Sequence, residues 1–209
     1  MYDIAKLIKA SDVQAAIRAL VDDPQAVIIA GGSDVLLSIR EGKLAGCSLV
    51  SIHNIPELKG ISIEPDGTIL IRPATTFSQI VNSPIIQQHI PMLGAVVEEV
   101  GGPQIRNLAT IGGNLCNGVT SADSAPSLLA FNANLELTGA AGVRQVPITE
   151  FYTGPGKTVR LHDEILTAIR IPKADYDGYF GQAIKYGKRN AMEIATLGCA
   201  VNVKLSPDK

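Results

Sequence analysis

The stretch that decides the fold is Asn107-Leu108-Ala109-Thr110-Ile111-Gly112-Gly113-Asn114-Leu115-Cys116-Asn117-Gly118-Val119-Thr120-Ser121-Ala122-Asp123. It gathers small residues, amides, hydroxyls and one carboxylate, and no long side chain follows Leu115. A glycine pair lets another group approach the main chain closely, and successive free N–H groups in such a turn form a concave anion site. Taken alone, the run is also typical of an ordinary loop with several turns.

A second glycine pair lies in Val27-Ile28-Ile29-Ala30-Gly31-Gly32-Ser33-Asp34-Val35-Leu36-Leu37. The β-branched run predicts a buried strand, the glycines predict a tight turn, and Ser33 or Asp34 is a suitable N-cap for a helix. Backbone N–H groups and the helix dipole at such a turn both favour an anion. The spacing matches neither a Rossmann fingerprint nor a P-loop. Two such turns about eighty residues apart indicate one ligand with two phosphates, such as a dinucleotide.

Composition excludes several classes of protein. The 209 residues carry a formal net charge of −2 and no basic stripe, so the sequence does not predict nucleic-acid binding. No apolar run is long enough for a membrane span, and the N-terminus lacks a signal-peptide pattern. Three distant cysteines (Cys47, Cys116 and Cys199) offer neither a zinc spacing nor a disulfide framework. We therefore expect a cytoplasmic protein whose thiols pack as small apolar groups, although Cys116 is also a candidate neighbour of the ligand.

The N-terminal part of the chain predicts a small α/β unit followed by a hairpin. Ser11 or Asp12 is expected to cap a first helix that ends near Asp22. Further elements are predicted at Val27–Ala30 (strand), Asp34–Arg40 (helix) and Leu49–Ile52 (strand). Turn chemistry at Pro65-Asp66-Gly67 then predicts a hairpin of Ile61–Glu64 with Thr68–Arg72.

The rest of the chain predicts helices first and strands later. Phe77–Val100 reads as helical with breaks at Pro84 and Pro91, and Ser124 is expected to cap a short helix that ends near Asn132. Strands are expected at Leu135–Thr138, Arg144–Pro147, Glu164–Ile171, Phe180–Tyr186 and Thr196–Leu205, with a polar linker at Lys173–Asp177 before the last two. Ser206-Pro207-Asp208-Lys209 has turn chemistry with no returning strand.

Six motifs, taken in order, resemble the FAD-binding medium subunit of molybdenum hydroxylases of the xanthine, carbon monoxide and nicotinate dehydrogenase types. They are Ala30–Leu36, Gly102–Asn107, Thr110–Asn114, Ser121–Asp123, Asp163–Leu166 and Lys185–Ala195. The resemblance implies an α+β protein. A two-lobed FAD-binding fold of the p-cresol methylhydroxylase type would span residues 1–172, with lobes at about 1–55 and 56–172. Residues 173–209 would open a C-terminal domain that is shortened compared with the family.

The resemblance also implies a set of cofactor-binding residues. The pyrophosphate cradle would be formed by the consecutive residues Ile29, Ala30, Gly31, Gly32, Ser33, Asp34 and Val35. Thr110, Gly113 and Asn114 would hold the pyrophosphate and the neighbouring sugar, and Asp123 would accept a hydrogen bond from FAD. Leu166 would lie near the flavin rings, or it is simply a core residue of a strand. Lys185 would lie near the polar edge of the flavin, where a cation stabilises the reduced form, or it is a solvated surface cation.

The function implied is electron transfer. Electrons would pass from a molybdopterin-binding large subunit, through the 2Fe–2S clusters of a small subunit, to FAD on this chain and on to NAD or another acceptor. The chain itself then needs no catalytic acid–base residue, and no metal-site motif is present. His53, His89 and His162 have no triad partners and read as surface or packing residues. Two alternatives stay open: a self-contained flavin reductase of the cell-wall enolpyruvyl type, and a non-catalytic flavin-binding assembly module.

Overall fold

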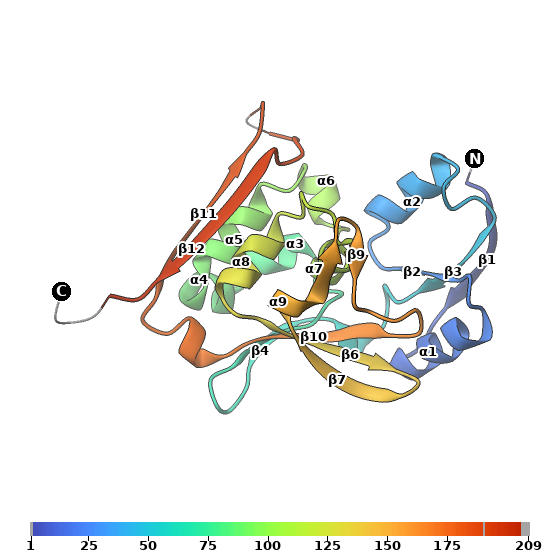
Figure 1. The fold of residues 1–209 in the computed structure, drawn as a ribbon, viewed down its shortest axis with the longest axis horizontal. Coiled ribbons are helices and arrows are strands. Elements are labelled where there is room, and N and C mark those ends of the chain that lie inside the picture. Colours follow the sequence, from blue (N-terminus) through green and yellow to red (C-terminus); the bar gives the residue numbers. More distant parts are fainter. Residues whose placement is uncertain (1, 190, 206–209) are drawn as a thin grey trace.

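The computed structural model describes residues 2–189 and 191–205. Residues 2–55, here called lobe one, form a three-stranded parallel sheet in the order β1-β3-β2 with a helix packed against it (Figure 1). Its elements are β1 (Ile4–Lys9), α1 (Val13–Asp22), β2 (Val27–Ile29), α2 (Ser33–Arg40) and β3 (Cys47–Ser51). The 3-10 helix η1 (Pro56–Leu58) leads out of this unit.

Local chemistry explains where α1 begins. Of the two candidate caps, Asp12 occupies the N-cap, and its side chain accepts a hydrogen bond from the Ala15 N–H at 2.7 Å. The helix then buries an apolar face on β3, with Ile17 and Leu20 in the same core cluster as Val50. The sequence did not predict β1. Most of its side chains are exposed, so it lacks an apolar face, and its parallel pairing with β3 holds it in place.

A five-stranded antiparallel sheet and a layer of helices form the larger lobe two. The strands run in the order β4-β5-β10-β6-β7, and the helices from α3 to α8 cover one face of the sheet (Figure 1). The strands are β4 (Ile61–Ile63), β5 (Ile69–Ile71), β6 (Asn134–Gly139), β7 (Gly142–Pro147) and β10 (Ile165–Ile171). The helices are α3 (Phe77–Val81), α4 (Pro84–His89), α5 (Pro91–Glu98), α6 (Pro103–Arg106), α7 (Ile111–Asn117) and α8 (Ser124–Ala130). The predicted β4–β5 hairpin, the breaks at Pro84 and Pro91, and the β6–β7 pairing are confirmed.

Short elements connect the end of β7, which pairs with Asn134, to the start of β10, which pairs with Thr138 near the other end of β6. They are α9 (Ile148–Phe151), β8 (Tyr152–Gly154) and β9 (Lys157–Thr158). After β10, the segment predicted as a polar linker contains the 3-10 helix η2 (Lys173–Asp175). Tyr176 follows it, belongs to the main core, and donates its hydroxyl to the Gly67 carbonyl. This segment is therefore anchored to lobe two.

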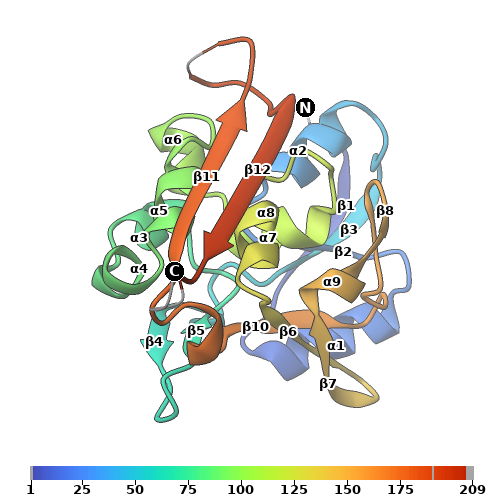
Figure 2. The same ribbon diagram turned by 60° about the vertical axis from the view of Figure 1, so that its left-hand side comes forward.

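The chain continues into an antiparallel hairpin of β11 (Phe180–Tyr186) and β12 (Leu197–Val203). The hairpin crosses the helical layer, with β11 on α5 and β12 on α8 (Figure 2). Ala183 and Ala200 are paired and pack against the main core. The opposite face is exposed and mainly apolar, with Phe180, Ile184, Tyr186, Leu197, Val201 and Val203. The turn predicted at Ser206–Lys209 lies outside the described residues.

Candidate functional site

A cavity of about 780 Å³ lies between lobe one, the helical layer of lobe two and the hairpin. Its walls come from the β2–α2 loop, α7, the β9–β10 connection and the β11–β12 loop. Twelve of the thirteen residues that the sequence predicts for cofactor binding line it: Ala30, Gly31, Gly32, Ser33, Asp34, Val35, Thr110, Gly113, Asn114, Asp123, Leu166 and Lys185. Ile29 is the exception, since it ends β2 and pairs with Ser51. Distant parts of the sequence therefore meet around one space.

The β2–α2 loop presents a row of hydrogen-bond donors. Gly32 has φ +83°, a left-handed conformation that favours glycine, and it occupies the N-cap of α2. The prediction of Ser33 or Asp34 as the N-cap is therefore wrong, and no side chain caps this helix. Within the described residues, the N–H groups from Gly31 to Val35 have no acceptor. These donors at a helix N-terminus suit a phosphate or another anion.

Gly31 has a different reason to be glycine. A Cβ at this position would overlap the carbonyl oxygen of Leu108, so the loop can pack directly on the main chain of lobe two only without a side chain. The close approach joins the two glycine-containing segments, because Leu108 precedes Thr110 and α7 by only a few residues. Of the pair Gly31–Gly32, Gly31 thus allows close packing on lobe two, and Gly32 sets the conformation of the loop that presents the N–H donors.

The prediction that Gly112 and Gly113 present free N–H groups in a turn is wrong. This segment is α7, and Thr110 is its N-cap, with Oγ1 accepting from the Gly113 N–H at 3.2 Å. The Gly112 N–H donates to the Pro73 carbonyl at 2.8 Å, and the Asn114 N–H donates to the Thr110 carbonyl at 3.0 Å. The run of small residues allows a short helix to pack closely, since a Cβ on Gly112 would lie 2.5 Å from that of Pro73. Side chains of α7, rather than its main chain, therefore face a ligand.

The side chain of Asn114, on α7, has a fixed orientation. Asn114 Oδ1 accepts hydrogen bonds from the Ser124 hydroxyl at 2.6 Å and from the Ser124 N–H at 3.3 Å. This arrangement leaves the Asn114 amide group as a donor at the cavity wall. Ser124 was predicted to be the N-cap of α8, but Asp123 holds that position without a side-chain cap bond.

Asp34 and Asn117 connect the two lobes across the cavity. Burial raises the pKa of the Asp34 carboxyl, and a hydrogen bond from Asn117 opposes that rise. Asn117 ends α7, while Asp34 lies in the first turn of α2. The two helix segments that carry the glycine pairs therefore approach each other at these side chains, and both side chains line the cavity.

A buried ion pair forms the opposite wall. Lys185 Nζ, from β11, donates to Asp123 Oδ2 at 2.9 Å and to the Glu99 carbonyl at 3.1 Å. The Lys185 and Asp123 side chains are only 7% and 9% exposed. Burial raises the pKa of Asp123, and the hydrogen bond and charge of Lys185 oppose the rise. The alternative interpretation of Lys185 as a solvated surface cation is therefore wrong.

Several cavity residues were not among the predicted cofactor-binding residues, although Cys116 was a candidate neighbour of the ligand. They come from α7 (Cys116, Asn117), the β9–β10 connection (Arg160, His162) and the β11–β12 loop (Met192, Glu193, Ile194). Burial raises the pKa of the Cys116 thiol to about 11, so this thiol is neutral and packs as an apolar group while also reaching the cavity. His162 does more than pack, because it lines the cavity and its Nε2 lies 3.1 Å from the Leu20 carbonyl oxygen. No periodicity marks Arg160, His162, Met192, Glu193 and Ile194, since they belong to connections, and α7 itself was not predicted as a helix.

The walls fit a dinucleotide in chemical terms. Free main-chain donors meet the requirements of a phosphate, amide donors suit phosphate or sugar oxygens, and apolar residues such as Leu166 and Ile165 suit a ring system. Among the described residues, no group of three His, Cys, Asp or Glu side chains is placed to hold a metal ion. No helix in the described part of the chain is long and apolar enough to cross a membrane.

Comparisons with known proteins place these features in a family. Residues 3–174 match the family described as the FAD-binding domain in molybdopterin dehydrogenase. The xanthine dehydrogenase FAD-binding subunit of Escherichia coli O157:H7 is 45% identical over 205 residues, which cover 98% of this chain and 70% of that protein. The nicotinate dehydrogenase FAD-subunit of Eubacterium barkeri is 34% identical over 187 residues, covering 88% of this chain and 62% of that protein. The solved structure of carbon monoxide dehydrogenase from Hydrogenophaga pseudoflava superposes with a TM-score of 0.93 at 29% identity, covering 99% of this chain and 71% of that chain.

Proposed function

This chain belongs to the family of FAD-binding domains of molybdopterin dehydrogenases, and from that membership we propose that it transfers electrons within a larger enzyme. Its cofactor is FAD, its α+β fold is that of the FAD-binding subunits, and it is a subunit of an oxidoreductase related to xanthine and carbon monoxide dehydrogenases. When bound, FAD supplies the redox chemistry, and the protein supplies position and electrostatics.

The row of free N–H groups from Gly31 to Val35 is the observation that carries the proposed binding site. Main-chain donors at the start of α2 would bind the pyrophosphate of FAD. The side chains of Thr110 and Asn114, together with the space beside Gly113, would complete the phosphate and sugar site on α7. Leu166, buried and on the cavity wall, would pack against a ring of the cofactor. Asp123 and Lys185 would face the cofactor as a pair.

The electron path is part of the proposal. A molybdopterin-binding large subunit would oxidise the substrate, and a 2Fe–2S small subunit would deliver the electrons to this chain. NAD or another acceptor would then remove them. We propose a cytoplasmic complex of these three kinds of subunit. Relatives named as the FAD subunit of xanthine dehydrogenase and of nicotinate dehydrogenase support this assignment.

The division of labour along the chain is also proposed. Residues 1–172 would form the FAD-binding domain, with its lobes divided near residue 55, and the segment from residue 173 would open a second domain. The cavity supports this division, because the two lobes supply the proposed phosphate donors and the hairpin supplies Lys185. Residues of this chain would therefore bind, orient and electrostatically tune the cofactor without acting as acid or base.

The test is the visible spectrum of the purified complex, followed by addition of NADH under anaerobic conditions. Flavin bands together with iron–sulfur absorbance are expected. If NAD is the acceptor, NADH should bleach both, because its electrons enter at the flavin and pass back to the clusters. A flavin that binds but resists NADH and dithionite-reduced partner subunits would favour the assembly-module alternative. Purification as a flavoprotein without molybdenum or iron–sulfur partners would favour the self-contained reductase.

A further inference from the structure

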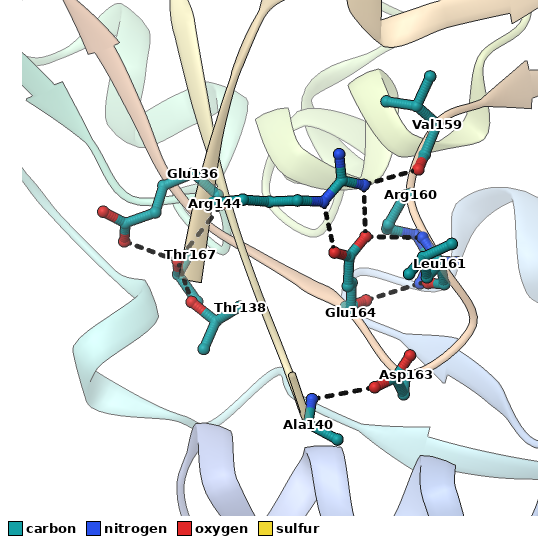
Figure 3. A network of polar contacts seen from close by, with 10 residues as sticks. All are labelled: Glu136, Thr138, Ala140, Arg144, Val159, Arg160, Leu161, Asp163, Glu164 and Thr167. Atoms are coloured by element: carbon teal, nitrogen blue, oxygen red, sulfur yellow. Dashed lines mark hydrogen bonds and ion pairs between the residues drawn. The ribbon is translucent and has the colours of Figure 1, made fainter. Parts of the chain in front are cut away.

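The connection between β9 and β10, residues 159–164 and here called the strap, is held by charged side chains (Figure 3). Glu164 accepts two hydrogen bonds from Arg144, at 2.6 Å from Nε and at 2.8 Å from Nη2. It also accepts one from the Leu161 N–H at 2.7 Å, and Arg144 donates to the Val159 carbonyl at 2.8 Å. Both ends of the strap are thus fixed to the same bidentate pair.

The strap is also fixed to its surroundings on two sides. Asp163 Oδ2 accepts a hydrogen bond from the Ala140 N–H at 2.9 Å, at the β6–β7 turn (Figure 3). His162 Nε2 lies 3.1 Å from the Leu20 carbonyl oxygen and 3.2 Å from the Asp23 carbonyl oxygen, at the C-terminal end of α1. The strap therefore links lobe two to lobe one along one edge of the cavity.

Arg160 is the charged residue that the strap presents to the cavity. Its Nη1 donates to the carbonyls of Leu161 at 2.9 Å, His162 at 3.3 Å and Glu164 at 2.7 Å. Its Nε and Nη2 have no acceptor among the residues that the structure describes. One nitrogen of the guanidinium thus orients the group, and the donors on the others are available to a ligand.

Arg160 differs in its ionic partners from Lys185, a second cation at the cavity wall. Lys185 is neutralised by Asp123 at 2.9 Å, whereas Arg160 has no carboxylate within ion-pair distance in residues 2–189 and 191–205. Arg160 is close enough to Cys116 for its charge to lower the pKa of that thiol, against the larger effect of burial. Arg160 lines the same cavity as Gly31 to Val35, so its free donors and the free N–H groups of α2 border one space.

We propose that Arg160 is a ligand-binding residue that donates from Nε and Nη2 to a phosphate of the dinucleotide, together with the main-chain donors of α2. This inference rests on the proposed function, because it assigns an unpaired cation to the anionic part of FAD. Arg144, Glu164 and His162 are positioning residues, since they hold the strap that carries Arg160. Phosphate binding would then draw on both lobes, with N–H groups from lobe one and a guanidinium from lobe two.

The experiment measures FAD affinity of the full chain, freed of flavin, by quenching of flavin fluorescence at low and at high ionic strength. Arg160→Gln is compared with Arg160→Lys and with Arg18→Gln, which removes an exposed cation of α1 that does not line the cavity. We expect Arg160→Gln to weaken FAD binding by roughly tenfold or more at low salt, because a charge-assisted hydrogen bond is lost. We expect the FAD affinity of the wild type to fall with added salt. The dependence of affinity on salt should be shallower in Arg160→Gln, because one cation–phosphate contact is gone.

Arg160→Lys keeps the charge, so its salt dependence should follow that of the wild type, and Arg18→Gln should match the wild type in both measurements. The unfolding midpoint of each flavin-free variant reports whether the fold is intact. Unchanged FAD affinity in Arg160→Gln would show that Arg160 serves only the strap. The same conclusion would follow if Arg160→Gln and Arg160→Lys reduced the affinity by the same factor and left its salt dependence unchanged. Absence of FAD binding by the wild type would instead overturn the proposed function itself.

Discussion

Lys185 Nζ lies 2.9 Å from Asp123 Oδ2, and this buried pair joins β11 of the hairpin to the start of α8. The ammonium also donates to the Glu99 carbonyl at the end of α5, so it is held from two sides. Removing either partner would leave the other charge buried without compensation, which is costly. The pair therefore fixes a positive and a negative charge at known places in the cavity wall.

This geometry predicts opposite effects on the flavin reduction potential. Lys185→Met should lower the potential, because the cation that favours the negative charge gained on reduction is lost. Asp123→Asn should raise it, because the carboxylate no longer offsets Lys185. We expect shifts on the order of 30 mV, which correspond to about 1.4 kcal/mol for a two-electron couple. Spectroelectrochemistry of flavin-replete variants measures them, with Lys188→Met, an exposed cation outside the cavity, as control. Shifts of the same sign in both variants would contradict this prediction.

Glycine substitutions should separate cofactor binding from folding. Among the described residues, and apart from the chain neighbours and the backbone of α7 itself, a Cβ at Gly113 would have only Thr110 Oγ1 within 4 Å, so we expect Gly113→Val to lose FAD with an intact circular dichroism spectrum. Gly32→Val should also abolish FAD retention, but φ +83° adds conformational strain of about 1–2 kcal/mol. Gly42→Val is the matched control, because Gly42 has φ +80°, and in the described part of the chain nothing lies within 4 Å of a Cβ there and Gly42 does not line the cavity.

Flavin content after purification and the urea midpoint give the two readouts. Gly42→Val should lose stability and keep FAD, whereas Gly113→Val should lose FAD and keep most of its stability. Full flavin content in both Gly32→Val and Gly113→Val would exclude the β2–α2 loop and α7 as the phosphate site.

The sequence predicted elements with strong local chemistry and failed where tertiary packing decides. Asp12 as a cap, the Pro65-Asp66-Gly67 turn and the breaks at Pro84 and Pro91 each carry their own local signal, and the structure confirms them. The helix α7 contradicts its local signal, because two adjacent glycines are poor helix formers. It forms because Thr110 caps it and because Gly112 fits against Pro73, a contact from far along the chain.

The candidate site shows the same contrast between what sequence motifs predict and what only tertiary packing reveals. Gly31 and Lys185 were predicted from motifs that resemble a family, and their place on one cavity follows from the structure. Arg160 lies just before the Asp163–Leu166 motif, in a connection that carries no helical or strand periodicity. Its significance depends on the absence of a carboxylate partner among the described residues and on the pair of Arg144 with Glu164, neither of which sequence spacing reveals.

The hairpin should be less stable locally than the sheet of lobe two. The β11–β12 sheet has only two strands, its outer face is exposed, and each strand has one unpaired edge within the described residues. The central strand β10 is paired on both sides and buried. We expect the amides of Val201 and Val203 to exchange hydrogen faster than that of Ile169 in the isolated chain.

Hydrogen exchange followed by mass spectrometry tests this on the isolated chain and again on the complex. Greater protection of the hairpin in the complex would show that another polypeptide covers it. Protection of Val201 and Val203 equal to that of Ile169 in the isolated chain would show that packing on α5 and α8 is sufficient, and the prediction would be wrong.

The Arg144–Glu164 pair should make stability depend on pH in the acid range. The hydrogen bonds from Arg144 hold the pKa of Glu164 below its usual value of 4.5, more strongly than burial raises it. Because the folded pKa lies below the unfolded one, the stabilisation is fully present above pH 4.5 and is lost as the pH falls through the folded pKa. Glu164→Gln should therefore lower the free energy of unfolding by about 2 kcal/mol at neutral pH, as expected for hydrogen bonds to a charged group.

The difference between wild type and Glu164→Gln should then shrink as the pH falls below 4.5, because protonated glutamic acid and glutamine are both neutral. Urea unfolding across this pH range measures it, and Glu150→Gln, an exposed position outside the strap, should show no difference at any pH. If the destabilisation in Glu164→Gln were the same at pH 7 and below the folded pKa, the strap would be held by shape and neutral hydrogen bonds. Its charge would then contribute nothing to the placement of Arg160.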